Sequence, residues 1–193
     1  MLYHRYGDPR EVMQLEEADA PVAGEGEVVI RVNAASANPV EWHLVRGEPS
    51  LVRFIAGLRG PKDPFVGGDG SGVVESVGPG VDGLAVGDAV FGATLGSFAE
   101  LARAKAARLA LKPASLTFEQ AACLPVAGCT ALQAVRDHGR LQADGRVLVI
   151  GAAGGVGSLA IQIAKALGGE VTGVCEPGVR ARARRRPRRR LHA

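Results

Sequence analysis

The amino-acid sequence predicts a chain of mixed class, α/β and β, with an antiparallel β-barrel domain followed by a β-α-β unit. Short strand-like runs separated by glycine and aspartate turns predict the first part. The pattern becomes helical after Lys112-Pro113, and a glycine-rich turn between a strand and a helix predicts the second part. We place the domain boundary near residues 114–116, which gives domains at 1–115 and 116–176 and a tail at 177–193.

The β-α-β unit is expected between Arg146 and Val174. Val147 to Ile150 is a β-branched and leucine run, typical of a fully buried strand in a parallel sheet. Gly168 and Gly169 end the helix that follows, and Glu170 to Val174 resumes the strand pattern. The helix itself is indicated by apolar residues at three- and four-residue spacing, namely Val156, Leu159, Ala160, Ile163, Ala164 and Leu167.

The turn in this unit carries small residues at the three spaced positions of a G-x-G-x-x-G pattern, namely Ala152, Gly154 and Gly157. Unpaired N–H groups and the helix dipole favour an anion there without a basic side chain. The pattern predicts a dinucleotide site, and a merely structural tight turn is the alternative. A membrane span is excluded, because glycines and polar residues interrupt the apolar run. The cofactor-binding candidates are Ala152, Ala153, Gly154, Gly155, Val156 and Gly157.

Positive charge is concentrated at one end of the sequence. The 193 residues carry a formal net charge of +3, but residues 177–193 hold eight arginines and no acid. Residues 1–176 therefore carry 15 basic and 20 acidic groups, a net charge of −5, which argues against a nucleic-acid-binding surface on this part. We expect the tail to be a solvated end; an anion- or nucleic-acid-binding module is the alternative.

Cysteine usage and the first residues indicate a reducing compartment. Cys123, Cys129 and Cys175 are too few and too scattered for a disulfide framework or a four-cysteine zinc site. The opening MLYHRYGDPREV has no apolar run of the kind that a secretory signal needs. We expect a cytoplasmic protein with no membrane partner.

The first domain is expected to consist of short strands. We expect these at residues 26–32, 73–77, 84–91 and 97–102. The stretch VGGDGSG at 66–72 precedes a strand instead of following one, which predicts a tight turn lining a cleft.

Helices are expected at three further places. Asn38-Pro39 predicts a loop leading into a short helix that reaches Gly47. Thr117 to Gln120 fits a capping box that opens a helix through Leu124, and residues 127–137 form the next helix.

Six stretches between residues 3 and 175 together carry a family resemblance. They are YGDPREVMQLEE, GEVVIRVNAASANPVEW, GGDGSGVVESVGPGVDGLAVGDAVFG, GSFAELA, AACLPVAGCTALQAV and GAAGGVGSLAIQIAK. In this order they resemble the medium-chain dehydrogenase/reductase superfamily, and within it the zinc-independent quinone oxidoreductase-like reductases. The resemblance implies a GroES-like barrel that holds the substrate and a Rossmann domain that binds NADPH.

The resemblance also implies the chemistry and its residues. Zinc-dependent relatives have a cysteine near the position of Asn38 and a histidine near Gly68, so no metal is expected. Hydride transfer from NADPH to a quinone, enone or carbonyl is implied instead. Asn38 is the catalytic candidate, beside the nicotinamide and the substrate carbonyl, and Thr130 resembles a position that contacts the nicotinamide. The alternative for Asn38 is a structural role in an Asn-Pro turn, and the alternative for Thr130 is a role as a cap at a helix N-terminus. Asp69 resembles a structural acid of its turn. Trp42 is expected in the core, with a place in the wall of the cleft as the alternative.

The resemblance stops after Cys175. Glu176 stands where an acid binds the ribose of NAD, and Arg180 is a candidate for a 2′-phosphate, but the resemblance favours NADP(H). Relatives continue with further strands, so we expect a chain shortened inside the cofactor domain, with exposed apolar faces, a bare sheet edge and little turnover. A non-catalytic remnant with weak nucleotide binding is the alternative. The family is often homodimeric, and the part of the sheet that pairs the subunits is not expected here.

Overall fold

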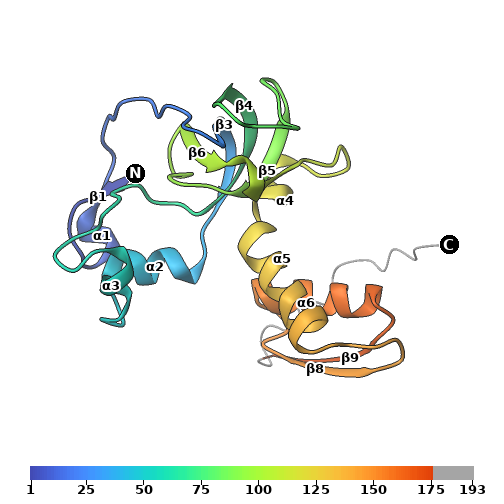
Figure 1. The fold of residues 1–193 in the computed structure, drawn as a ribbon. Helices are drawn as coiled ribbons and strands as arrows, with labels where there is room; N and C mark the ends of the chain where they lie inside the picture. The colour runs from blue at the N-terminus through green and yellow to red at the C-terminus, as the bar shows by residue number, and fades with distance from the viewer. Residues whose placement is uncertain (176–193) are drawn as a thin grey trace. The chain divides into compact units, whose positions relative to one another are not determined.

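The computed structural model describes residues 1–175 of the chain, which fall into two compact units (Figure 1). The first unit is Met1–Val126, and the second begins at Ala127. This division lies after α4 (Phe118–Ala122), a short helix that packs against the strands of the first unit. The sequence-based boundary near residue 115 follows the change in pattern along the chain, whereas the compact unit also includes the helix beyond it.

The first unit contains a five-stranded antiparallel sheet with the strand order β6-β3-β4-β5-β7. This confirms the antiparallel β domain, and β6 and β7 lie at the edges of the sheet. A second, two-stranded sheet pairs the beginning of the chain with residues that follow α1. The strands are β1 (Leu2–Tyr3), β2 (Met13–Gln14), β3 (Glu27–Ser36), β4 (Asp69–Val77), β5 (Ala89–Ala93), β6 (Leu101–Lys105) and β7 (Leu109–Leu111).

Alternation along the strands produces the core of this sheet. Val28 and Ile30 of β3 are fully buried, and they pack with Val74, Val90 and two alanines of β6. Inward and outward residues alternate because successive side chains of a strand point to opposite faces. Val29, between them, is also buried, at an irregularity in the pairing of β3 with β4, so the strand predicted as half-buried is covered on both faces at this point.

Three strand predictions differ from the structure. The strand expected at 97–102 is displaced along the chain, because residues 98–100 form bends and β6 begins only at Leu101. The other two differences occur at glycines. The stretch predicted as a tight turn at 66–72 turns only at Gly67, with a φ of +107°, and Asp69 already begins β4. The strand predicted across Gly87 is interrupted there, because Gly87 has a φ of +94° and β5 starts at Ala89. Both glycines adopt a backbone conformation that side chains disfavour. Gly87 thereby interrupts a predicted strand, whereas Gly67 limits the turn, so β4 begins earlier than predicted.

Three helices of the first unit, α1, α2 and α3, lie apart from the five-stranded sheet, beside β1 (Figure 1). The α2 helix begins with proline at its first position and ends at Gly47, which has a φ of +63° and closes the helix in the left-handed conformation. A small core of Tyr3, Val12, Val45 and Val66 holds this region together. The elements are α1 (Pro9–Val12), α2 (Pro39–Arg46), α3 (Val52–Ala56) and the 3₁₀ turn η1 (Ala106–Arg108).

The α4 helix begins with the predicted capping box. The side chain of Thr117 accepts the N–H of Gln120 at 3.2 Å, and the Gln120 side chain accepts the N–H of Thr117 at 3.0 Å. The Ser71 hydroxyl of β4 donates to the carbonyl of Phe118 at 2.6 Å. The helix is thereby tied to the sheet.

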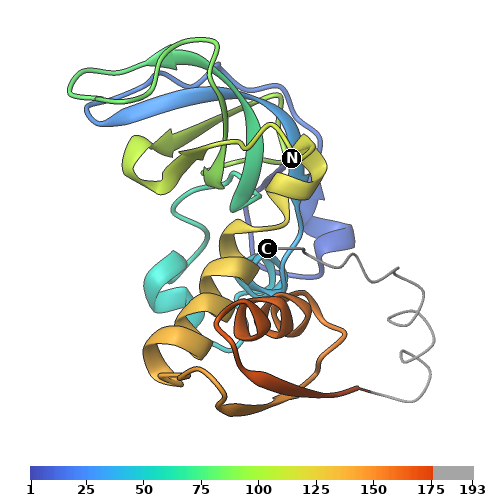
Figure 2. The same cartoon turned by 90° about the vertical axis from the view of Figure 1, so that its right-hand side faces the viewer.

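The second unit is a β-α-β unit, as predicted (Figure 2). Its strands β8 and β9 are parallel, with Arg146 opposite Glu170 and Ile150 opposite Val174. A parallel pair needs a crossover connection, which α6 supplies. The elements are α5 (Pro125–Leu132), which enters the unit, the π-helical turn η2 (Gln133–His138), β8 (Arg146–Ile150), α6 (Gly155–Ala166) and β9 (Glu170–Val174).

The two parallel strands are covered on one face. Val147, Val149 and Val171 pack toward α6 and η2. On the other face, Leu148 is 61% exposed and Ile150 is 79% exposed. The prediction of a fully buried strand is wrong, because the helices of this unit pack on one side of the pair. The expected exposed apolar face is confirmed within the described residues.

Candidate functional site

The turn between β8 and α6 is fixed by backbone hydrogen bonds. Gly151 has a φ of +77° and donates its N–H to the carbonyl of Val174 at 2.9 Å, and Ala152 donates to the same oxygen at 3.0 Å. Gly154 is the N-cap residue of α6, and its N–H donates to the Gly151 carbonyl at 3.0 Å. The strand therefore leads directly into the start of the helix.

Gly157 shows the closest approach between the turn and the helix. A Cβ atom added there would lie 2.2 Å from the carbonyl oxygen of Gly151. Real Cβ atoms do not approach backbone oxygen so closely, so only glycine allows this packing. The close contact between strand and helix is the role that the last glycine has in dinucleotide-binding turns.

Three backbone amides at the start of α6 are available for a ligand. The N–H groups of Gly155, Val156 and Gly157 donate to no acceptor within residues 1–175. They belong to the first turn of a helix of 12 residues, where the helix dipole adds positive potential. Such an end binds anions, and phosphate groups in particular.

A groove extends from these amides along β8. Its volume is about 630 Å³, and its walls come from η2, from β8, and from the glycine turn. The walls include Val135, Leu141, Val147, Val149, Gly155 and Val156. The second unit therefore joins a mostly apolar groove to an anion-binding helix end.

The other predicted cofactor residues divide between the two units. Ala152, Ala153 and Thr130 belong to the second unit, together with the glycines, whereas Asn38 belongs to the first. Thr130 lies within α5 and is exposed, so the alternative that it caps a helix N-terminus is wrong.

Asn38 is the N-cap residue of α2 and also part of a polar cluster. Its side-chain nitrogen donates to Oδ2 of Asp69 at 3.2 Å, and it lies 3.5 Å from the hydroxyl oxygen of Ser36. The first contact uses one amide proton. The second contact is a hydrogen bond at the longest accepted distance and is therefore weak, so a ligand oxygen that accepts more strongly can replace Ser36 as its acceptor.

Asp69 is the buried centre of this cluster. The side chain has no exposed surface, and its Oδ2 also accepts the N–H of Val126 at 3.0 Å. Its other oxygen, Oδ1, accepts no hydrogen bond from the described residues. Burial raises the pKa of Asp69, although the hydrogen bonds from Val126 and Asn38 act in the opposite direction. The sequence-based view of Asp69 as a local turn acid misses these long-range partners.

Glu41 is a buried link that the sequence analysis missed. Its carboxylate accepts the backbone N–H of Asn38 at 2.7 Å and the N–H of Gly68 at 3.1 Å. It therefore joins the start of α2 to the turn before β4. The spacing of Asn38 and Glu41, with a helix following, is the sequence signal that marks such a capping residue.

We expect the Glu41→Ala substitution to lower the free energy of unfolding by about 2 kcal/mol, because two partly buried N–H groups lose their acceptor. Chemical denaturation followed by circular dichroism measures this change. The control is Glu48→Ala, since Glu48 is half exposed and pairs with Arg46 at the surface. Equal effects of the two substitutions would contradict the role given to Glu41.

Trp42 is not in the core, and the corresponding prediction is wrong. It is 48% exposed, and the Arg46 guanidinium lies 4.7 Å from its ring centroid. The side chain lies on the outer face of α2, because that helix buries Glu41 and Val45 instead.

Asn38 and Gly68, which stand near the positions of zinc ligands in zinc-dependent relatives, already make other contacts in this structure. Gly68 donates to Glu41, and a Cβ atom at Gly68 would lie 3.0 Å from Oε1 of that glutamate. A larger residue there would need Glu41 to move. Within residues 1–175, no three His, Cys, Asp or Glu side chains form a cluster that could hold a metal ion.

A smaller cavity of about 200 Å³ lies in the first unit. Its walls are mainly apolar, with Glu41 and Thr94 as polar members and with Val40, Leu44, Phe65, Val66 and Leu95 among the others. The Thr94 hydroxyl is buried without a hydrogen-bond partner among the described residues.

Known proteins match both units of the chain. Residues 24–114 match the model of the alcohol dehydrogenase GroES-like domain. The chain is 34% identical over 182 residues to the chloroplast envelope quinone oxidoreductase homolog of Arabidopsis thaliana, covering 90% of this chain and 54% of that protein.

Solved structures of quinone oxidoreductases are also similar to this chain. The quinone oxidoreductase from Coxiella burnetii superposes with a TM-score of 0.81 and 31% identity, covering 95% of this chain and 58% of the other. The Escherichia coli quinone oxidoreductase complexed with NADPH superposes with a TM-score of 0.74 and 32% identity, covering 89% and 51%. The chain thus spans between 51% and 58% of the length of these three relatives. These matches, together with the antiparallel domain and the β-α-β unit, show that the chain belongs to the medium-chain dehydrogenase/reductase superfamily, among the quinone oxidoreductase-like proteins.

Proposed function

We propose that the protein is a zinc-independent, NADPH-dependent oxidoreductase that acts on a quinone, an enone or a carbonyl compound. The observation that carries this proposal is the start of α6, where three N–H groups without acceptors lie beside a glycine that admits no Cβ atom. The Escherichia coli relative was solved with NADPH, which supports the choice of cofactor.

The residues of the second unit fit the diphosphate of such a cofactor. Gly155, Val156 and Gly157 would hold it with their backbone amides, and the groove along β8 offers apolar walls to the rest of the molecule. When bound, NADPH supplies a hydride. Glu176 and Arg180, the residues considered for the choice between NAD and NADP, lie outside the described residues.

The first unit supplies a hydrogen-bond donor and a cavity for the substrate. Asn38 is held by Asp69, and its second, weaker bond to Ser36 can be exchanged for one to a developing negative charge on a substrate oxygen. The cavity lined by Val40 and Thr94 is the proposed place for a small apolar substrate. Glu41 takes the N–H of Gly68, which supports a site built without zinc.

The cellular location is also a proposal. All three cysteines are unpaired, which fits a reducing compartment such as the cytoplasm. None of the helices in the described part of the chain is long and apolar enough to cross a bilayer.

Titration of the full chain with NADPH, followed by the fluorescence of the reduced nicotinamide, tests the proposal. We expect saturable binding and, with 1,4-benzoquinone present, oxidation of NADPH at a rate that EDTA leaves unchanged. Asn38→Ala is expected to lower the rate by about a hundredfold and to change the NADPH affinity much less, because the lost amide acts mainly on the substrate oxygen.

Three outcomes separate the parts of the proposal. Absence of saturable binding would contradict the cofactor site. Binding without any turnover would contradict the catalytic part and agree with a non-catalytic remnant. Loss of the rate with EDTA would contradict the zinc-independent assignment.

A further inference from the structure

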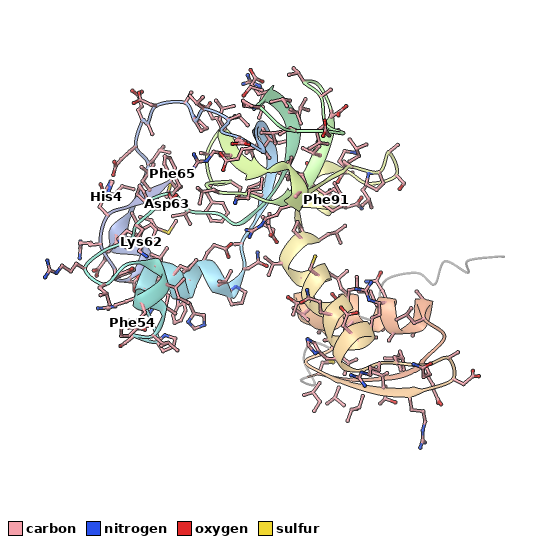
Figure 3. All side chains as sticks on the ribbon, in the orientation of Figure 1. His4, Phe54, Lys62, Asp63, Phe65 and Phe91 are labelled. Carbon is pink, nitrogen blue, oxygen red and sulfur yellow. The ribbon has the colours of Figure 1, made fainter. Side chains whose placement is uncertain are left out.

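The segment that contains α3 exposes four large apolar side chains. Leu51 is 70% exposed, Phe54 68%, Ile55 78% and Leu58 66%. We call residues 49–62 the α3 segment. It belongs to the part of the first unit that holds α2 and lies away from the five-stranded sheet (Figure 3). Single exposed apolar residues are ordinary, but four within eight positions mark an interaction surface.

Interior contacts hold the backbone of this segment in place. The Tyr6 hydroxyl donates to the carbonyl of Gly57 at 2.6 Å. Arg53 donates to the Gly47 carbonyl at 3.1 Å, and its guanidinium lies 5.0 Å from the Tyr6 ring. The N–H of Lys62 donates to the carbonyl of Ala56 at 2.7 Å. The apolar side chains are therefore exposed on a loop that is already ordered. Binding does not have to overcome the conformational entropy of ordering this loop.

The charge of the α3 segment is opposite to that of the rest of the first 176 residues. Residues 49–62 contain three basic residues and no acid, whereas residues 1–176 as a whole carry a net charge of −5. Arg59 and Lys62 are exposed, and Figure 3 shows Lys62 in the same part of the unit as Phe54. Exposed apolar side chains beside exposed cations are the pattern of a surface that lies on anionic lipid.

Other occupants fit this surface less well. A second copy would bring the cations of one α3 segment against those of the other, which is unfavourable. Nucleic acid would pair with the cations, but it offers no apolar interior for Phe54 and Ile55. We propose that the α3 segment docks the protein on the surface of an anionic membrane, with Phe54 and Ile55 inserted at the headgroup level, which replaces the sequence-based expectation of no membrane partner. This proposal does not depend on the oxidoreductase activity.

The chain contains its own reporter for the test. Trp42 is the only tryptophan, it is half exposed, and it lies on α2, which contacts α3. The eight arginines after residue 177 are expected to attract anionic vesicles by charge alone, so sedimentation with vesicles is not a sufficient measurement. The emission of Trp42 responds to what happens beside the α3 segment.

The experiment mixes the full chain with vesicles of phosphatidylcholine, either alone or with phosphatidylglycerol. We expect a blue shift of Trp42 emission, and quenching by brominated lipid, only with the anionic vesicles. Replacing Arg59 or Lys62 by glutamine is expected to weaken the response about fivefold each. Phe54→Asp combined with Ile55→Asp is expected to weaken it at least about tenfold.

The matched control is Leu15→Asp combined with Val22→Asp. These residues are 85% and 81% exposed and lie outside the α3 segment, so this variant should respond as the unaltered chain does. The proposal is overturned if anionic vesicles sediment the chain without changing Trp42 emission. It is also overturned if the Phe54/Ile55 variant responds fully, or if that variant only abolishes self-association.

Discussion

Replacing Gly157 by alanine is expected to lower the free energy of unfolding by about 3 kcal/mol and to weaken NADPH binding at least tenfold. The added Cβ atom would lie 2.2 Å from the Gly151 carbonyl oxygen, and this backbone atom can move only if the turn itself moves. The displacement changes the positions of the amides at the start of α6. Thermal unfolding and NADPH fluorescence titration measure the two effects.

Gly155→Ala is the matched control for this substitution. Gly155 lies in the same helical turn, but a Cβ atom there meets only the Cβ of Ala127, at an ordinary 3.9 Å. The stability should therefore remain close to that of the unaltered chain. If both alanine variants bind NADPH equally well, the turn has no special role in holding the cofactor.

Replacing Asp69 by alanine is expected to lower the free energy of unfolding by about 3 kcal/mol, because the substitution removes a buried acceptor shared by Val126 and Asn38. Asp69→Asn keeps an oxygen at this place and is expected to cost less at neutral pH. It also removes the titrating group, and this makes it the informative variant for pH dependence.

The sign of that dependence follows from the raised pKa. Burial raises the pKa of Asp69 above its ordinary value of 3.8, so the folded state binds this proton more tightly than the unfolded state. The contribution to stability is full below pH 3.8 and is lost as the pH rises through the higher folded-state value. Compared with Asp69→Asn, the unaltered chain should therefore become less stable as the pH rises from 4.

Melting temperatures of the unaltered chain and of the Asp69→Asn variant, recorded between pH 4 and pH 8, measure this change in relative stability. The exposed residue Asp19 supplies the control, because Asp19→Asn also removes one negative charge but breaks no buried contact. A difference between the unaltered chain and Asp69→Asn that does not change with pH, or that grows in favour of the unaltered chain, contradicts the raised pKa.

The sequence predicted best the parts of the fold that depend on local patterns. The strand from Glu170 to Val174 and the helix that ends before Gly168 were predicted closely, because periodicity and glycine signals are contained within a few residues. The capping box at Thr117 is another local signal, and both of its hydrogen bonds are present. The glycine turn belongs to this class, since its spacing alone indicates where helix and strand come into contact.

Long-range contacts could not be predicted in this way. Asp69 and Val126 are bonded although 57 positions separate them, and no local pattern marks that pair. Glu41 contacts Gly68 from another element, so the sequence shows its capping role but not the second partner. Burial was also misjudged at Trp42 and Ile150, because an apolar side chain does not reveal whether another element covers it.

The most direct test of the proposed cofactor site is the ¹H–¹⁵N spectrum of the full chain, recorded with and without NADPH. The amide signals of Gly155, Val156 and Gly157 should move most on saturation, because their N–H groups acquire an acceptor that they lack in the protein alone. Saturable binding that leaves these three signals unchanged would contradict the assignment of the diphosphate to the start of α6.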